Sequence, residues 1–232
     1  IELIKKDFDL VLLDKQVNDS FFLNNPIINS LDCKKYDETY RLDLTKWNEI
    51  KKNKNRSLQK IRWAKKKLLE LGNLSFVKII DNEDEKKKLI KQIINWKKDR
   101  KIDSNFLKSF SEEFYINIIN DKSIIISGLK LNNDYIALCL GVKNKKNYLY
   151  LVPSYKIDIN LSKYSPGKIL MIELIDYFET QDFKYFDFCN GKERYKKSWI
   201  TNKVDMNKYV QPINFFGVVY SWLLKVKTIN EK

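Results

Sequence analysis

The pattern between residues 123 and 152 constrains the fold most strongly. Three apolar segments follow one another there, at residues 124–129, 135–142 and 148–152, and each has the length of a strand. The turns between them are polar and short, which favours antiparallel pairing of consecutive strands. The sequence therefore predicts a sheet at the centre of this part of the chain.

Helical patterns flank this predicted sheet on both sides. Ile61, Ala64 and Leu68 recur near helical spacing, and Gly72 is well placed to end their helix. Alternation of such helices with strands predicts an α/β (α+β) fold with a mixed sheet. The expected helices start at Thr45 and span 58–71, 81 or 84 to 96, 104 or 111 to 119, 169–179 and 192–199, and the other strands span 9–13, 75–80, 183–188 and 209–213.

Histidine is absent from the chain. This excludes a Ser-His-Asp triad, a His-ligated metal site and an imidazole base within these residues. Cys33, Cys139 and Cys189 lie too far apart for a metal motif, and an odd, sparse set of cysteines favours a reducing compartment. With apolar runs too short to span a membrane and no secretory signal, we expect a soluble, cytoplasmic protein without a metal.

The formal net charge is +14, which favours polyanionic partners. However, 39 of the 44 basic residues are lysines, and isoleucine and asparagine are also abundant, as AT-rich codons produce. Nucleic-acid-binding proteins tend to use arginine, whose planar guanidinium group forms bidentate hydrogen bonds to phosphates and base edges. The charge therefore indicates a class of partner only weakly and no mechanism.

A helix start at residues 164–168 has the features of an anion site. Ser165 is placed to cap the helix, and Pro166 suits the first helical position. Gly167 allows close approach to the backbone, and the amides of Gly167 and Lys168 are expected to be vacant. Together with the helix dipole and the Lys168 ammonium they suit a phosphate or pyrophosphate. The same residues are also compatible with an ordinary helix start.

Asp187 lies on an aromatic strand face. It shares that face with Phe183 and Tyr185, where a carboxylate is costly unless it is paired or used in chemistry. If the role of Asp187 is structural, we expect its carboxylate to form a hydrogen bond to the turn at 190–191 or to Lys196. If the role of Asp187 is functional, we expect its carboxylate to belong to a site at the end of the strand.

An acid, a phenol and a cation follow this strand closely, at Glu193, Tyr195 and Lys196. Ligands of open α/β sheets collect at such carboxyl ends of strands. These three side chains are therefore candidate site residues, with a solvated charged surface as the alternative.

The stretch YSPGKILMIELIDYFETQDFKYFDFCNGKERYKKSW resembles the C-terminal half of the CelD-like acetyltransferases of the GNAT superfamily, which are related to the FemAB-like peptidyltransferases. The shared order is Tyr-Ser-Pro-Gly, an apolar helix, an Asp-Phe strand, a glycine, Tyr-Lys and a closing aromatic. Upstream, residues 44–72 resemble the family's tryptophan, polar spacer and basic helix before a glycine. The helix that ends at Trp96-Lys97-Lys98-Asp99-Arg100 also fits, so the likeness covers residues 9–199.

The resemblance implies a GNAT-like mixed, largely antiparallel sheet flanked by helices, with the acyl donor between its central strands. It implies an acyltransferase that moves an acyl group, expected to be acetyl, from acetyl-CoA or another acyl-CoA to an amine or hydroxyl, with cell-envelope or polysaccharide metabolism as an expected setting. The superfamily's pyrophosphate loop has two small residues, whereas this chain has one, which leaves an aminoacyl-tRNA donor open. The donor-binding residues it implies are Tyr164, Ser165, Pro166, Gly167 and Lys168.

The site residues suggest how acyl transfer would proceed without histidine. Transfer needs a base for the nucleophile, stabilisation of the oxyanion and an acid for the leaving group. We assign the base as a hypothesis to Asp187 or Glu193 and the acid to Tyr195, while Lys196 stabilises charge or positions the acceptor. A sugar, a peptide amine and a small amine all remain open as acceptors.

The likeness also predicts a domain organisation: residues 1–43 as the remnant of an N-terminal GNAT-like half, 44–80 as a basic helical linker and strand, 81–214 as the acyltransferase domain and 215–232 as an amphipathic tail. Three other functions are compatible with the sequence. They are a tRNA-dependent FemAB-like aminoacyl- or peptidyltransferase, a basic nucleic-acid-binding module around residues 56–67, and a non-catalytic copy of the enzyme. The oligomeric state is not assigned.

Overall fold

The computed structural model describes residues 8–17, 25–53, 56–99, 112–189 and 199–230. The chain divides into two compact units, which are described separately. Unit 1 combines the ends of the chain, Ile1–Thr39 and Lys203–Lys232, and unit 2 is the continuous segment Tyr40–Asn202. The four segments expected from the sequence stay a prediction.

Unit 2 is built on a mixed, largely antiparallel sheet. Neighbouring strands pair antiparallel except β6 and β7, which run parallel. This arrangement confirms the predicted α/β class with an open sheet flanked by helices. The strand order is the end of β2 (Lys34–Asp43), β7 (Tyr185–Asp187), β6 (Asn147–Tyr155), β5 (Asp134–Asn144), β4 (Ile124–Leu131) and β3 (Leu74–Val77).

The three central strands β4, β5 and β6 form the antiparallel meander that the apolar segments predict. Between β5 and β6 the register shifts, because Leu140 faces Val152 whereas Val142 faces Leu149. The extra residue therefore lies on β6 and makes a bulge there. Bulges turn side chains in new directions and are frequent beside functional sites.

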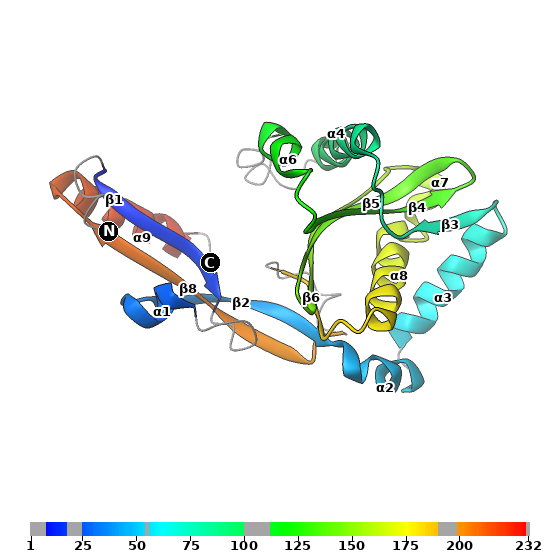
Figure 1. Cartoon of the computed structure of the whole chain (residues 1–232), viewed down its shortest axis with the longest axis horizontal. Coiled ribbons are helices and arrows are strands. Elements are labelled where there is room, and N and C mark those ends of the chain that lie inside the picture. Colours follow the sequence, from blue (N-terminus) through cyan, green and yellow to red (C-terminus); the bar gives the residue numbers. More distant parts are fainter. Residues whose placement is uncertain (1–7, 18–24, 54–55, 100–111, 190–198, 231–232) are drawn as a thin grey trace. The chain divides into compact units, whose positions relative to one another are not determined.

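Alternating residues of the sheet face two helical layers. Ile124 and Ile126 of β4 join the core beneath α4 (Glu83–Asp99) and α6 (Glu112–Ile118). Ile125, between them, joins the larger core beneath α8 (Pro166–Thr180) and α3 (Arg56–Leu69). Figure 1 shows these helix pairs on opposite faces of β4–β6. Period-two alternation explains why every residue of this strand centre is buried.

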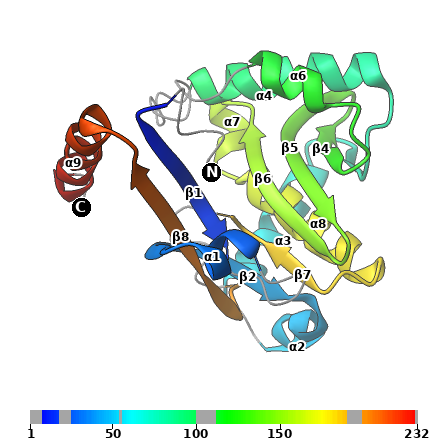
Figure 2. The same cartoon turned by 60° about the vertical axis from the view of Figure 1, so that its left-hand side comes forward.

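Helix α3 packs beside α8 through the stripe that its sequence predicts: Leu58, Ile61, Ala64 and Leu68 are all buried. Polar contacts add to this packing, because Lys65 Nζ lies 2.5 Å from Glu173 Oε1 of α8. The indole of Trp47, in α2 (Trp47–Lys52), is buried and donates to Asp176 Oδ1 of α8 at 2.7 Å. Figure 2 shows α8 and α3 behind the strands of this unit. The position of α3 is thus fixed by both apolar and charged contacts.

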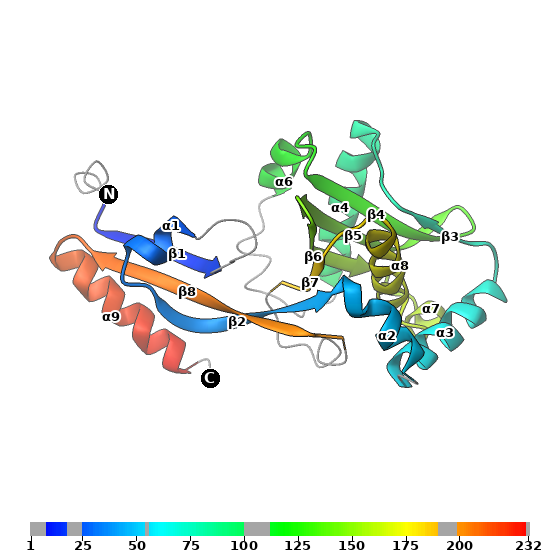
Figure 3. The same cartoon turned by 60° about the horizontal axis from the view of Figure 1, so that its bottom comes forward.

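Unit 1 contains a strand pair and a C-terminal helix. Strand β1 (Leu10–Val17) pairs antiparallel with β8 (Asn202–Pro212), and α1 (Pro26–Ser30) belongs to the same unit. Helix α9 (Phe215–Asn230) contacts β1 and lies along this pair in Figure 3. Its Gly217 approaches the Asp9 carbonyl so closely that an added Cβ would collide with it.

Several element boundaries differ from the sequence-based expectations. Asp43, rather than Thr45, caps the helical segment, because its carboxylate accepts from the Thr45 amide at 3.1 Å and a 3-10 turn (Leu44–Lys46) precedes α2. Helix α4 is capped by Asn82, which accepts from Glu85 N at 2.8 Å. The strand β2 was not predicted at all, because its alternation is largely polar. The helix expected at 192–199 lies mainly outside the described residues.

Among the residues that the structure describes, no helix combines the length and apolar character needed to cross a bilayer.

Candidate active site

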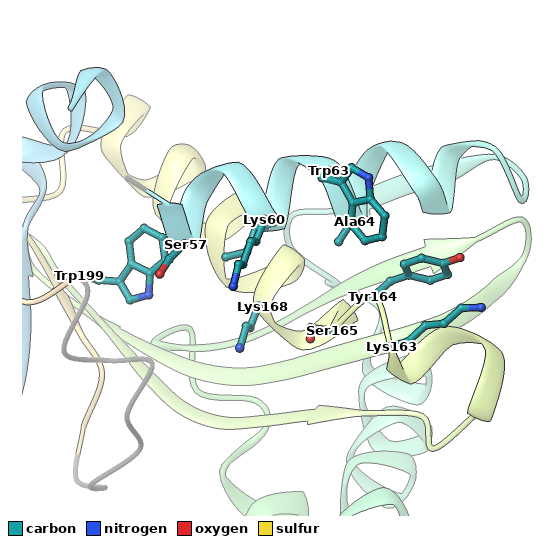
Figure 4. A pocket seen from close by; sticks show the side chains of 10 residues that line it. Ser57, Lys60, Trp63, Ala64, Lys163, Tyr164, Ser165, Lys168 and Trp199 are labelled. Atoms are coloured by element: carbon teal, nitrogen blue, oxygen red, sulfur yellow. The ribbon is translucent and has the colours of Figure 1, made fainter. Parts of the chain in front are cut away.

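A pocket of about 620 Å3 lies in unit 2 at the start of α8. Helix α3 forms one wall, and the segment that joins α7 (Ile159–Ser162) to α8 forms the other (Figure 4). This volume is within the range of small-molecule sites, about 300–1,000 Å3. The residues that line it are Ser57, Lys60, Ile61, Trp63, Ala64, Lys163, Tyr164, Ser165, Lys168 and Trp199.

The backbone at the start of α8 departs from the predicted cap. Ser165 occupies the cap position, but its φ of 51° is left-handed and its hydroxyl makes no capping hydrogen bond. An ordinary capping residue is extended, so that its oxygen reaches the first amides. The Ser165 hydroxyl is therefore not used by the helix and lines the pocket instead.

The sequence predicted that two backbone amides, those of Gly167 and Lys168, would be vacant, and this prediction is wrong for Lys168. The Lys168 amide donates to the Ser165 carbonyl at 2.9 Å and is already used within the first turn. Pro166 has no N–H, and the Gly167 amide has no acceptor among the described residues. One open amide binds an anion less firmly than a nest of amides would. Any anion in this pocket therefore depends on side chains.

Gly167 lies in a closely packed position. Its added Cβ would lie 3.1 Å from Cδ1 of Tyr155, and its carbonyl accepts from the Tyr150 hydroxyl at 3.3 Å. Tyr150 belongs to the bulge of β6, so the bulge ties the sheet to the first turn of α8. Pro166 is buried beneath this turn. Neither Gly167 nor Pro166 lines the pocket.

All charged side chains that line the pocket are cationic. Lys60, Lys163 and Lys168 line it, and its lining residues include no carboxylate. The ammonium of Lys163 lies 5.1 Å from the ring centroid of Tyr164, a cation–π distance. Cations gathered in a concave wall concentrate anionic ligands. The arrangement therefore suits a phosphate-bearing molecule.

Asp187 lies in a buried ion pair. Its Oδ2 accepts from Arg41 Nε at 2.7 Å, both side chains are nearly inaccessible, and Oδ1 accepts from the Cys189 amide at 2.7 Å. Arg41 and Asp187 face each other directly across β2 and β7. The sequence correctly indicated that this carboxylate needs a partner, and Arg41 is one; the 190–191 turn and Lys196, which were the expected partners, lie outside the described residues. Asp187 does not line the pocket.

Strands β6 and β7 pair over only three residue pairs, from Asn147 with Tyr185 to Leu149 with Asp187. Beyond Leu149, β6 continues to Tyr155, and no strand of the described residues pairs parallel with that part. The resemblance places the acyl donor at such a divergence of the central strands. The predicted site residues Glu193, Tyr195 and Lys196 lie outside the described residues.

Buried polar side chains mark the base of β6. The Tyr148 hydroxyl lies 3.7 Å from the Cys139 sulfur, and both side chains are fully buried. Burial raises the pKa of the Cys139 thiol to about 12 and holds the pKa of the Tyr148 phenol well above its ordinary value. Both groups are therefore neutral near pH 7 and serve packing.

The pocket-lining residues Ser57, Lys60, Trp63, Lys163 and Trp199 were not singled out from the sequence as site residues. For Trp63 a signal exists, because a large aromatic stands among basic residues away from the apolar stripe of its helix. Ser57, Lys60 and Lys163 are ordinary surface residue types, and Trp199 is the closing aromatic of the resemblance. Only the packing of α3 beside α8 brings them to one site.

Comparison with known proteins identifies the class. The sequence profile of the acetyltransferase (GNAT) domain matches residues 54–197, more than half of the chain. The chain therefore belongs to the GNAT acetyltransferase family. No curated protein matches the chain significantly.

Three solved structures share the fold at low sequence identity. They are a conserved protein of unknown function from Bacteroides thetaiotaomicron (10% identity, TM-score 0.54, 88% of this chain and 62% of that one), the C-terminal domain of a proposed lysylphosphatidylglycerol synthetase from Agrobacterium fabrum (12%, 0.54, 93% and 71%), and FemX (12%, 0.52, 84% and 65%). The chain thus spans less than two thirds of the first and third of these.

Proposed function

We propose that the protein is an acyltransferase that moves an acyl group, preferentially acetyl, from acyl-CoA to an amine or hydroxyl acceptor. The observation that carries the proposal is the lysine-lined pocket at the first turn of α8, in a chain of the GNAT family. Acyl-CoA supplies an activated thioester, and its phosphates match the three ammonium groups. Family and pocket chemistry thus favour the same donor.

In the proposed reaction, the acceptor nitrogen or oxygen attacks the thioester carbonyl, the new C–N or C–O bond forms and the C–S bond breaks. The acceptor proton passes to a base, for which Asp187 or Glu193 is the candidate, and Tyr195 protonates the departing thiolate. Lys196 stabilises charge or positions the acceptor. Because Asp187 is paired with Arg41, we favour Glu193 for direct proton transfer and a water-mediated or positioning part for Asp187.

The CelD-like assignment, a saccharide or peptide acceptor, and a role in cell-envelope or polysaccharide metabolism belong to this proposal. The fold shared with FemX supports a second candidate, a tRNA-dependent aminoacyl- or peptidyltransferase, and the charge of +14 is compatible with it. A nucleic-acid-binding module without catalysis is the third candidate.

Calorimetric titration of the full chain with acetyl-CoA, longer acyl-CoAs and aminoacylated tRNA tests these candidates together. We expect acetyl-CoA to bind and aminoacylated tRNA to show no saturable site at moderate salt. Tight binding of the tRNA with no heat from any acyl-CoA would replace the first candidate by the second. Heat from none of them would favour the non-catalytic copy.

A further inference from the structure

The C-terminal helix α9 directs its large apolar side chains away from the rest of unit 1. Within residues 215–223 the buried residues are Gly217 and Ser221, which lie one helical turn apart on the same face. A helix that packs on its domain through an apolar face has the reverse pattern, with large side chains inside and small ones outside. The exposed residues form what we call the outward face of α9: Phe215, Phe216, Val218, Val219, Tyr220, Trp222 and Leu223, which are 43–76% exposed.

Contacts at the start of α9 fix this orientation. A Cβ on Gly217 would lie 1.8 Å from the carbonyl oxygen of Asp9, so this side of the helix already touches backbone. The side-chain amide of Asn214 donates to Asp9 Oδ1 at 2.5 Å, and its oxygen accepts from the Gly217 amide at 3.0 Å. Rotation of α9 about its axis would press a larger side chain against the Asp9 carbonyl. The large side chains of the outward face therefore stay outside.

The outward face is large enough for a specific protein interface. Its four aromatic side chains are 55–76% exposed, and because an aromatic side chain buries about 150–250 Å2, these four offer about 400–650 Å2. Two valines and a leucine bring the total close to the roughly 800 Å2 per partner of a standard-size interface. The largest apolar patch of a typical monomer covers only about 300–600 Å2. The size of the outward face thus indicates an interaction surface.

The charge of unit 1 indicates which kind of partner fits this surface. Unit 1 contains ten lysines and ten aspartates and glutamates, so its formal net charge is zero and the excess of +14 belongs to unit 2. Residues 215–224 contain no charged side chain. A neutral unit gains little attraction from an acidic protein or an anionic membrane surface. An uncharged apolar face is complementary to itself, and two copies can meet there without bringing like charges together.

We propose that two copies of this chain associate through α9, with the outward face of one helix packed against the same face of the other. Such an interface is isologous, because a two-fold axis relates identical surfaces and closes the assembly at a dimer. Phe216 and Trp222 are its anchors, since a few buried aromatic side chains carry most of the binding energy of protein interfaces. The interface belongs to unit 1 and does not depend on the donor or acceptor of the proposed reaction.

Sedimentation velocity of the full chain measures this association, at protein concentrations from about 1 to 100 μM, which include the weak end of interfaces of this size. We expect the dimer to predominate at the upper concentration. Trp222→Ala and Phe216→Ala should each raise the dissociation constant about thirtyfold or more, as truncation of an anchor residue does. A change from about 50 to 200 mM NaCl should alter the constant less than about twofold, because the outward face carries no charge to be screened.

Trp63→Ala is the matched control, since Trp63 is 57% exposed but belongs to α3 in unit 2. It should leave the dissociation constant unchanged. Trp222→Glu is the stronger variant, because it places two like charges in the contact, and it should be monomeric at every concentration. Circular dichroism of each variant should match the parent, since every altered side chain is exposed.

A parent chain that stays monomeric up to about 100 μM would overturn the inference, as would a dimer that Trp222→Ala and Phe216→Ala leave intact. Vesicles of phosphatidylcholine with phosphatidylglycerol form a second arm. If they bind a monomeric parent and Trp222→Glu abolishes that binding, the outward face docks on lipid and the second copy is wrong. A titration with acetyl-CoA separates the inference from the proposed function: a dimer that binds no acyl-CoA would support the interface alone, whereas a monomer that binds acetyl-CoA would support the function alone.

Discussion

At the scale of single residues, the ion pair of Arg41 and Asp187 is the most consequential contact. Both side chains are nearly inaccessible, and their charged atoms lie 2.7 Å apart. A buried charge that loses its partner is strongly destabilising, whereas loss of both charges together often costs little. The pair therefore determines how any variant of Asp187 must be interpreted.

We expect Asp187→Asn to lower the free energy of unfolding by about 3–5 kcal/mol in urea titrations, because the buried Arg41 loses the charge of Asp187. The double variant Arg41→Leu/Asp187→Leu should be less destabilised than Asp187→Asn. Asp182→Asn, which removes an exposed pairing with Lys146, is the control and should be close to neutral. An Asp187→Asn protein as stable as the parent would contradict the pairing, and its turnover per folded molecule would then report catalysis alone.

The buried Cys139 and Tyr148 make stability depend on alkaline pH. The folded state keeps both groups protonated, because burial raises the pKa of Cys139 to about 12 and that of Tyr148 above its ordinary value. The unfolded chain releases these protons near pH 9 and 10, so the folded state binds more protons and the free energy of unfolding falls as pH rises.

We expect Tyr148→Phe to flatten this dependence above pH 10, by up to about 1.4 kcal/mol per pH unit. Urea titrations from pH 7 to 10.5 measure the two slopes. The difference between variant and parent should be constant between pH 7 and 8, and parallel curves up to pH 10.5 would refute the assignment.

At this scale the sequence predicts a special role for a residue when its type is unusual for its position. It does not predict a role that arises only from tertiary packing. Asp187 was identified because a carboxylate on an aromatic strand needs a partner. Arg41 was missed because 146 positions separate it from Asp187, and only the pairing of β2 with β7 joins them. The left-handed backbone at Ser165 was also not predicted, since serine more often caps in an extended conformation.

At the scale of elements, the sequence predicted strands and helices best where hydrophobic periodicity is strong. The meander β4–β6 and helix α8 lie where expected, because burial on both faces or a wide apolar face leaves a clear pattern. Strand β2 was missed because polar residues alternate along most of it. The packing of α3 beside α8 was not predictable from either helix alone.

Helix α9 docks within unit 1 through its smallest residue. A Cβ on Gly217 would collide with the Asp9 carbonyl, which is backbone and cannot turn aside. We expect Gly217→Ala to detach α9, seen as faster amide hydrogen exchange in α9 and β1. Val219→Ala, at an exposed position of the same helix, is the control and should leave exchange unchanged. Equal protection in both variants would refute this packing.

At the scale of the whole molecule, binding through the net charge of +14 and binding in the pocket should differ in how strongly they depend on salt concentration. Binding that tracks a phosphate backbone weakens steeply with salt, whereas a small donor in a preformed pocket contacts few phosphates. Between 50 and 200 mM NaCl we expect acetyl-CoA affinity to fall by less than tenfold, by calorimetry. A single-stranded RNA of similar charge to tRNA serves for comparison and should lose far more. A steep loss for acetyl-CoA would place its binding on the general surface charge.

The wall formed by α3 comes from residues that precede the meander β4–β6 in the chain, whereas α8 follows it. A ligand bound between α3 and α8 would bridge two segments that lie about a hundred positions apart in the chain. Ligand binding should then oppose local unfolding of α3, and a fragment that begins after that helix would lose one wall of the pocket together with β2 and Arg41.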